Sequence, residues 1–360
     1  MNIVVVTSST RGALVGGSER NAVYTCERLS ELYGEVTLVI LNCRAIQNIG
    51  VDSVICIPSD SFFVQVFQFC RAISGLIRKG AQPHAFIGFS EQANTLLAVS
   101  RRLGGISGPI LMRLSTVVSD YLRGRPVRRV VAIATYLAAN VIIAQSKTIK
   151  RDFESEFGVN WKKVVQIGNE FIGWRATPDL LDQSIVGRPF ILCLGNFRPE
   201  KGHLRLIRIF ASTSSEISLV LVGSGELVSE INNAIKSFSL SGRVVMTGVL
   251  DNPVNYIAAS AGIFIPSHFE GNPNVVYEAD HYGKPIGGFS DCAVLHELQG
   301  DGYDITLIEP DNSQAFSSLL DRWSSSCSPS TESPPTSSRS NIATLYTAAI
   351  GHARSTFDHI

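Results

Sequence analysis

Short runs of apolar residues alternate with helix-forming segments along the first half of the chain. The first helix is expected from Ser18 to about Leu32, because Val23 and Cys26 recur at three-residue spacing on one face and Gly34 suits the position just beyond its end. Alternation of this kind predicts a parallel sheet covered by helices on both faces. The expected strands are Ile3–Thr7, Val36–Leu41, Ser53–Ile57, Ala85–Phe89, Ile110–Arg113 and Val141–Gln145.

The second half of the chain repeats the same alternation. Its expected strands are Phe190–Leu194, Ser218–Val222, Val244–Thr247, Ile263–Pro266, Pro285–Gly288 and Ile305–Ile308. Two successive sheets predict an α/β protein with two Rossmann-like, doubly wound domains. Ligands of such sheets bind outside the carboxyl ends of the strands, so both domains can turn their functional loops towards a shared cleft.

The domain boundaries follow from local composition. We expect an N-terminal domain over residues 1–175 and a C-terminal domain over 187–325. Residues 169–188, which include Pro178, show little periodicity and are interpreted as a linker. Residues 324–340 are rich in Ser and Pro and are expected to form a solvated loop. A helix over 341–360 can pack back onto the N-terminal domain.

No segment is expected to span a membrane. The longest mostly apolar run, Val130–Ala144, is about 15 residues long, whereas a spanning helix needs about 20. We interpret this run as a buried helix followed by a strand. The N-terminus has the pattern of a strand and lacks the positive region of a signal peptide. The 7 Cys form no Cys-x-x-Cys pair, which favours reduced thiols in a cytoplasmic protein.

Charge is balanced overall but not along the chain. The 31 Lys and Arg equal the 31 Asp and Glu, so wholesale nucleic-acid binding is not expected. Residues 1–180 carry 20 basic and 13 acidic side chains, a net +7, and the remainder carries −7. Seven arginines lie between Arg101 and Arg129, with Asp120 as the one acid among them. They form either a solvated face or a patch for anionic lipid head groups or an anionic acceptor.

The strongest chemical signal lies in residues 266–279. A strand ends at Pro266, a loop follows, and a helix begins near Asn274, with Asn272 and Asn274 both suited to cap it. A helix N-terminus offers free N–H groups and a positive dipole end, which suit a diphosphate. Glu270 and Glu278 flank this point and can accept hydrogen bonds from sugar hydroxyls. The segment therefore predicts a sugar-nucleotide site.

A second basic loop follows the first strand of the same domain. Arg198 and Lys201 would project from the strand end, where Arg offers a fork to phosphate oxygens and Lys a point charge. Gly202 permits a tight turn into the next helix. A solvated pair of cations is the alternative, but their presence beside the two glutamates in one domain favours the phosphate site.

The ordered set of motifs resembles a retaining GT-B glycosyltransferase of family four, the glycosyl transferases group 1, over most of the chain. The motifs are Gly16-Gly17-Ser18-Glu19-Arg20, Gln166-Ile167-Gly168-Asn169, Phe197-Arg198-Pro199-Glu200-Lys201-Gly202-His203, Leu219-Val220-Leu221-Val222-Gly223-Ser224-Gly225, Thr247-Gly248, Glu270 to Glu278, and Gly283-x-Pro285. This resemblance implies a GT-B fold. It also implies transfer of a hexose or amino sugar from a nucleotide donor, in which UDP is favoured, to a glycan or lipid-linked acceptor in cell-surface polysaccharide synthesis.

The resemblance also implies roles for individual residues. Arg198 and Lys201 would hold the donor diphosphate and stabilise the leaving nucleotide. Glu278 would accept hydrogen bonds from the ribose hydroxyls, and Glu270 would position the transferred sugar.

Further donor contacts are implied for backbone positions. Asn274 and Val275 would face the phosphates, and Gly248 would lie against the base. Gly16 and Gly17 would let the first helix approach the diphosphate.

On the acceptor side the resemblance points to Arg113 and Ser115. No cofactor and no metal are expected, since the chain has no Asp-x-Asp triplet. A sugar-nucleotide epimerase or hydrolase of the same fold, or a non-catalytic sugar-nucleotide-binding scaffold, remains open as an alternative. Gly223-Ser224-Gly225 starts like a dinucleotide fingerprint but lacks its third glycine.

Overall fold

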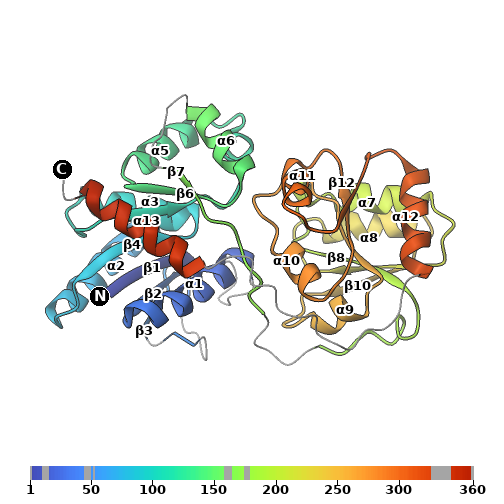
Figure 1. Cartoon of the computed structure of the whole chain (residues 1–360), viewed down its shortest axis with the longest axis horizontal. Helices are drawn as coiled ribbons and strands as arrows, with labels where there is room; N and C mark the ends of the chain where they lie inside the picture. The colour runs from blue at the N-terminus through green and yellow to red at the C-terminus, as the bar shows by residue number, and fades with distance from the viewer. Residues whose placement is uncertain are drawn as a thin grey trace. The chain divides into compact units, whose positions relative to one another are not determined.

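The structure is a computed structural model, and it describes residues 2–9, 16–43, 50–51, 53–157, 164–173, 179–325 and 342–357. The chain divides into two compact units (Figure 1). The first comprises Met1–Ile172 together with Arg339–Ile360, and the second comprises Gly173–Ser338. Each unit is described by itself below.

The N-terminal unit is built on a parallel sheet of seven strands in the order β3-β2-β1-β4-β5-β6-β7. The strands are β1 (Asn2–Ser8), β2 (Val36–Leu41), β3 (Ser53–Ile57), β4 (Pro83–Gly88), β5 (Ile110–Arg113), β6 (Val141–Ala144) and β7 (Val164–Gln166). The helices are α1 (Gly17–Tyr33), α2 (Phe62–Arg78), α3 (Glu91–Arg102), α4 (Val118–Leu122), α5 (Pro126–Leu137), α6 (Lys147–Phe157) and α13 (Ile342–Phe357).

Alternating side chains of the central strand enter two separate cores, because successive strand residues point to opposite faces. Val4 and Val6 pack under α2 to α6, whereas Ile3 and Val5 pack under α1 and α13. All four are fully buried. The last helix of the chain therefore completes the face that the first helix begins, and α13 lies beside α1 (Figure 1).

The C-terminal unit is built on a parallel sheet of six strands in the order β10-β9-β8-β11-β12-β13. The strands are β8 (Phe190–Leu194), β9 (Ser218–Val222), β10 (Val244–Gly248), β11 (Gly262–Ile265), β12 (Ile286–Phe289) and β13 (Ile305–Ile308). A 3-10 turn, η1 (Pro199–Lys201), precedes the helices α7 (His203–Ala211), α8 (Val228–Ser237), α9 (Val254–Ala259), α10 (Asn274–His281), α11 (Ala293–Gly300) and α12 (Ser313–Ser325).

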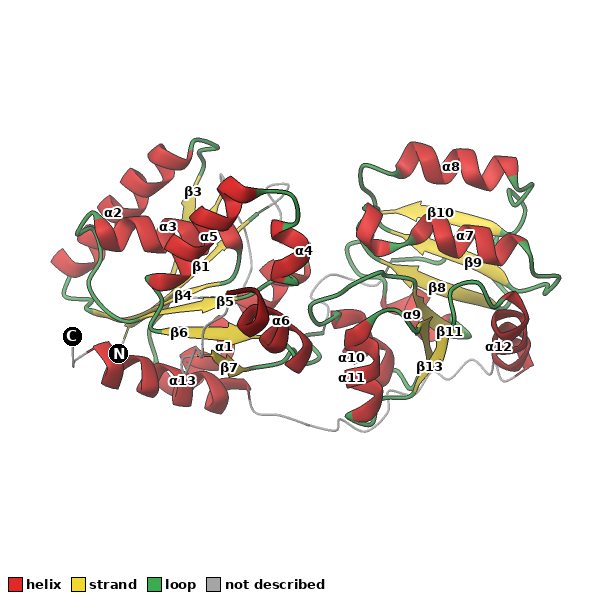
Figure 2. Cartoon of the chain, turned by 90° about the horizontal axis from the view of Figure 1, so that it is seen from above, coloured by secondary structure: helices red, strands yellow, loops and turns green. Residues whose placement is uncertain are grey.

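This sheet also separates two cores. Helices α7, α8 and α12 cover one face around Phe264 and Trp323, and α9, α10 and α11 cover the other around Ile263 and Ile265. Figure 2 shows α7 and α8 on the same side of β8 to β10. The two doubly wound sheets confirm the predicted fold class, and the predicted strands agree with the observed ones to within two residues at each end.

Three local predictions need correction. The short edge strand β7 was not predicted. Residues 179–188 do not form a free linker, because Ile185 is buried in a core of the C-terminal unit and Asp179 bonds with Asn252. Ser324 and Ser325 belong to α12 rather than to a loop. The rest of the predicted loop, and Pro178, lie outside the described residues.

The prediction that the helix α5 is buried also needs correction. Val127, Val130 and Leu137 are 76%, 68% and 61% exposed, so an apolar stripe of this helix faces outward. Ala132 and Tyr136 alone supply its hydrophobic contact with the core. The apolar run predicted burial correctly only for the strand that follows.

Candidate functional site

The carboxyl ends of β8 and β11 meet at the point where the strand order of the C-terminal sheet reverses. The chain builds outward from β8 to β9 and β10 on one side, and then returns to lay down β11, β12 and β13 on the other. The connections leave β8 and β11 in opposite directions at this switch point, which opens the crevice where ligands of doubly wound sheets bind. The loops that follow these two strands carry Arg198, Lys201 and Glu270.

The loop after β8 turns tightly into α7 at Gly202. This residue is in the left-handed region at φ 67°, which glycine adopts without a Cβ clash. A Cβ here would lie 2.0 Å from the carbonyl oxygen of Pro266. The backbone N–H of His268 also donates to the carbonyl of Glu200 over 2.8 Å. Glycine thus allows the two loops to pack directly on each other.

Lys201 and Glu270 form an ion pair across these loops. The ammonium Nζ lies 2.6 Å from Glu270 Oε1, and their side chains are 28% and 11% exposed. The Ser267 hydroxyl donates to the same oxygen over 2.6 Å. The cation and the carboxylate that the sequence placed 69 positions apart are therefore held together, with the ammonium still accessible to an anionic ligand. Arg198, at the start of η1, is exposed.

Helix α10 begins four residues after Glu270. Asn274 is its first residue and Pro273 occupies the N-cap position, so the expected asparagine cap is replaced by a residue whose side chain cannot accept a hydrogen bond. Because α10 follows the parallel strand β11, its N-terminus lies at the carboxyl end of the sheet, where a helix start can bind an anion. Val275 is half-buried in the first turn. Glu278 lies in the second turn and is 4% exposed.

A buried histidine adjoins the lysine. His203 is 1% exposed and packs edge-on against Phe197, with the ring centroids 4.7 Å apart. Neither ring nitrogen has a hydrogen-bond partner. Burial, and secondly the charge of Lys201, lower its pKa to about 4. The imidazole is therefore neutral near pH 7 and adds no positive charge to the site.

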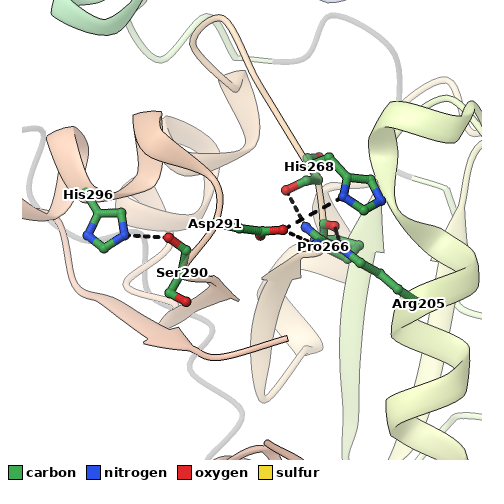
Figure 3. A network of polar contacts seen from close by, with 7 residues as sticks. Arg205, Pro266, His268, Ser290, Asp291 and His296 are labelled. Atoms are coloured by element: carbon green, nitrogen blue, oxygen red, sulfur yellow. Dashed lines mark hydrogen bonds and ion pairs between the residues drawn. The ribbon is translucent and has the colours of Figure 1, made fainter. Parts of the chain in front are cut away.

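The loop that contains Glu270 is fixed by Arg205 of α7, a residue that the sequence analysis did not single out. Its guanidinium donates to the carbonyls of Pro266 and Ser267 and to Asp291, each over 2.6 Å (Figure 3). Arg205 is four positions after Lys201, but Gly202, in the left-handed region, separates η1 from α7, so the two residues do not share a helix. The sequence therefore offered no helical spacing by which Arg205 could have been identified.

The glycine-rich segment after β9 has a packing role. A Cβ on Gly223 would lie 2.0 Å from the Gly195 carbonyl oxygen, and one on Gly225 would lie 2.4 Å from that of Phe197. The absence of a Cβ at these two glycines thus lets the segment after β9 pack closely against the loop after β8. Gly248, at the end of β10, has φ 78° and accepts from the N–H of Gly223 over 2.8 Å.

The acceptor-side residues lie in the N-terminal unit, after β5. Ser115 is half-buried in the loop to α4. Arg113 is 1% exposed, and its guanidinium donates to Tyr346 over 2.9 Å and to the Ile167 carbonyl over 3.2 Å. This corrects the expectation of an acceptor contact at Arg113, because its charge is used to anchor α13 and the segment after β7.

The N-terminal glycines lie at the start of α1. Gly16 is its N-cap and Gly17 its first residue. A Cβ on Gly16 would overlap the carboxylate of Glu19. Ser18 ties this helix start to the end of β4, because its hydroxyl donates to the Phe89 carbonyl. Gly16 and Gly17 thus lie at the β1–β4 reversal of the N-terminal sheet, the counterpart of the β8–β11 reversal.

Metal ligands and membrane-spanning helices were both considered in the described ranges, residues 2–9, 16–43, 50–51, 53–157, 164–173, 179–325 and 342–357. Among these residues, no group of three or more His, Cys, Asp or Glu side chains is placed to hold a metal ion. No helix that the structure describes combines the length and apolar character needed to cross a bilayer.

Sequence comparisons match the C-terminal unit to a known family. The model of the family glycosyl transferases group 1 matches residues 182–332. A Campylobacter jejuni protein, N-acetylgalactosamine-N,N'-diacetylbacillosaminyl-diphospho-undecaprenol 4-alpha-N-acetylgalactosaminyltransferase, is 26% identical over 235 residues. That alignment covers 63% of this chain and 63% of the relative, which is less than two thirds of its length.

Solved structures share the fold of the whole chain. HepE from Anabaena, in complex with UDP and glucose, superposes with a TM-score of 0.71 at 16% identity, covering 99% of this chain and 98% of its own. Sucrose-phosphate synthase from Thermosynechococcus elongatus gives a TM-score of 0.70 at 16% identity, covering 99% and 95%. These likenesses establish the architecture of two Rossmann-like units.

Proposed function

Because residues 182–332 belong to the glycosyl transferases group 1 and the chain has the GT-B fold, we propose that the protein transfers a sugar from a nucleoside diphosphate donor to a hydroxyl acceptor. The observation that supports this most directly is the Lys201–Glu270 pair, whose glutamate precedes the start of α10 by four residues. An ammonium and a helix N-terminus suit a diphosphate, and the adjacent carboxylate suits sugar hydroxyls.

The proposed chemistry uses fixed positive charge where negative charge develops. The bond between the anomeric carbon and the phosphate oxygen breaks, and its electron pair stays on that oxygen. The acceptor oxygen bonds to the anomeric carbon, and its proton leaves with the nucleoside diphosphate. Arg198, Lys201 and the N–H groups at Asn274 and Val275 stabilise the leaving diphosphate. Losing one such preorganised contact costs about 3 kcal/mol.

The other proposed contacts concern the sugar and the nucleoside. Glu270 positions the transferred hexose or amino sugar, and Glu278 accepts from the ribose hydroxyls. Gly248 lies against the base. We also propose donor contacts for Gly16 and Gly17 and an acceptor contact for Ser115. We propose UDP as the nucleotide and retention of the anomeric configuration, with no metal or other cofactor.

The acceptor is proposed to be a glycan precursor or a lipid-linked saccharide in the synthesis of a cell-surface polysaccharide. The Campylobacter jejuni relative, whose name describes transfer to a diphospho-undecaprenol acceptor, supports this choice of acceptor class. With such an acceptor, the protein is proposed to work at the surface of a membrane, on its cytoplasmic side.

The proposed membrane contact is the outer face of α5. Arg125 and Arg128 are exposed and have no acidic partner in the described part of the chain, while Val127, Val130 and Val131 are 76%, 68% and 47% exposed beside them. Cations interleaved with apolar side chains on one helix favour the head-group region of an anionic bilayer.

Fewer arginines of the expected cluster are available to a membrane than the sequence suggested, so the proposed contact is limited to α5. Arg113 is buried, and Arg101 donates to the carbonyls of Ala138 and Gly108. Arg123 pairs with Asp120 and Arg129 with Glu156, each over 2.6 Å.

Donor binding is tested by thermal shift across UDP and a panel of UDP-sugars. A ligand that binds only the folded state raises the apparent melting temperature. We expect UDP to stabilise the wild type and the Lys236→Ala control, whose side chain is exposed on α8, but not Lys201→Ala. Glu278→Gln preserves the size of the side chain. It should reduce the rise in melting temperature that UDP gives by more than it lowers the melting temperature of the free protein. Equal stabilisation of all four proteins by UDP would reject the site.

Membrane binding is tested with sedimented phosphatidylcholine vesicles that do or do not contain phosphatidylglycerol. Each arginine near an anionic surface contributes about 1 kcal/mol, so Arg125→Gln with Arg128→Gln should weaken binding about 30-fold. The matched control changes two other exposed cations of the unit, Arg78 and Lys79, to Gln. If vesicle binding does not depend on the phosphatidylglycerol content or on the salt concentration, this contact is rejected.

A further inference from the structure

Arg205 is placed to control the geometry of the donor site without belonging to its exposed surface. Its side chain is 13% exposed. Its Nε donates to the carbonyl of Pro266, one terminal nitrogen donates to that of Ser267, and the other donates to Asp291. Figure 3 shows the guanidinium between Pro266 and Asp291. Three charge-assisted bonds to fixed acceptors immobilise both the arginine and the segment it holds.

The two carbonyls that Arg205 binds belong to the residues that lead out of β11 towards Glu270. Ser267 is doubly used, since its carbonyl accepts from Arg205 and its hydroxyl donates to Glu270 Oε1 over 2.6 Å. The path from the guanidinium to the Glu270 carboxylate therefore passes through one residue. Movement of Ser267 changes the position of the Glu270 carboxylate.

Arg205 is itself held from two sides. Asp291, in the turn after β12, accepts from it over 2.6 Å, and the guanidinium lies over the ring of Phe289 with 4.4 Å to the centroid. The His268 ring also faces Asp291, with Nδ1 at 3.8 Å. A lysine could supply the charge at this point, but it has no planar fork to reach two carbonyls and a carboxylate together.

We propose that Arg205 is a positioning residue of the transfer reaction, which fixes Ser267 and Glu270 against Lys201 so that the sugar-binding carboxylate is preformed. This inference rests on the proposed function. It assigns Arg205 to the sugar half of the donor: the diphosphate contacts of η1 and α10 are built without it, whereas the carboxylate that meets the sugar is not. Asp291 acts through Arg205.

The test compares UDP, which lacks the sugar, with the UDP-sugar that best stabilises the wild type. Arg205→Gln should bind UDP within a few-fold of wild type and lose the extra stabilisation given by the sugar. A misplacement of about 1 Å can cost about 100-fold in rate, so we expect the rate of UDP release from that UDP-sugar to fall to this extent. Arg205→Lys should restore part of the rate, and Asp291→Asn should be impaired less than Arg205→Gln.

Arg208 provides the matched control, because it is exposed on the same helix one turn beyond Arg205. Arg208→Gln should behave as wild type. A role confined to stability would lower the melting temperature and the active fraction of Arg205→Gln but leave its KM and its preference for UDP-sugar over UDP unchanged, and that result would overturn the proposal. If the wild type binds no UDP, the proposed function fails instead.

Discussion

The raised pKa of the Glu91 carboxyl group predicts how the stability of the protein depends on pH, and this dependence reports on burial in the N-terminal unit. Glu91 is the first residue of α3; its Oε2 accepts from the Tyr136 hydroxyl over 2.7 Å, and its Oε1 is buried without a partner. Burial raises the pKa of this carboxyl from 4.5 to about 7, although the Tyr136 hydrogen bond opposes the rise. The folded protein therefore retains a proton that the unfolded chain loses above pH 4.5.

The sign and size of the effect follow from this difference. The contribution of Glu91 to stability is greatest below pH 4.5, falls as the pH rises towards 7, and levels off above it, because in that window the unfolded state alone releases this proton. The pKa difference of about 2.5 units corresponds to about 3 kcal/mol at 1.36 kcal/mol per unit. Glu91→Gln keeps an acceptor for Tyr136 and has no proton to lose.

The assay is urea unfolding at pH 5 and pH 8, with hydrogen exchange in α3 and α5 to report on this unit. The variant should nearly match wild type at pH 5 and exceed it by about 3 kcal/mol at pH 8. Glu31→Gln, at an exposed position of α1, serves as the control and should follow wild type at both values. If the stability of wild type and Glu91→Gln changes in parallel between pH 5 and pH 8, the carboxyl is not held neutral by burial.

Three further predictions concern other buried or tightly packed positions. Gly202→Ala should abolish stabilisation by UDP in the thermal-shift assay, because its Cβ would lie 2.0 Å from the Pro266 carbonyl oxygen and force the two site loops apart; retention of wild-type binding would contradict this. His203, with its pKa lowered to about 4, is neutral when folded, so its contribution to wild-type stability should fall as the pH drops from 6.5 to 4. His203→Phe should remove that dependence in urea titrations, and an unchanged slope would be evidence against it. Tyr346→Phe removes an acceptor of the buried Arg113 and should cost about 1.5–3 kcal/mol of unfolding free energy, measured by urea; a loss below 0.5 kcal/mol would mean that water replaces the hydroxyl.

Much of the fold was readable from the sequence because its strands are buried on both faces. A strand such as β2, in which all six residues are buried, is an apolar run interrupted only by Thr37. The proximity of two proposed donor-site residues was also readable, since Lys201 and Glu270 follow predicted strands of one parallel sheet and such strands end at a common edge. The structure adds that the two side chains form a direct ion pair over 2.6 Å.

The exposed helix faces and the edge strands were harder to predict from the sequence. The apolar residues of α5 predict burial, yet this helix covers its core with few side chains and turns Val127 and Leu137 outward. The strand β7 has 3 residues at the edge of its sheet and too little apolar sequence to be recognised. Composition does not distinguish an apolar stripe that meets a core from one that meets another partner.

The sequence by itself determined the order of strands and helices, the two parallel sheets and the residues at their carboxyl ends, because these depend on local periodicity and on the direction of the chain. Only the tertiary structure decided which charges are buried and what they hold. Arg113, Arg205 and Glu91 are ordinary polar residues in the sequence. Their partners Tyr346, Asp291 and Tyr136 lie 233, 86 and 45 positions away, and such distant partners are selected by packing rather than by any local pattern.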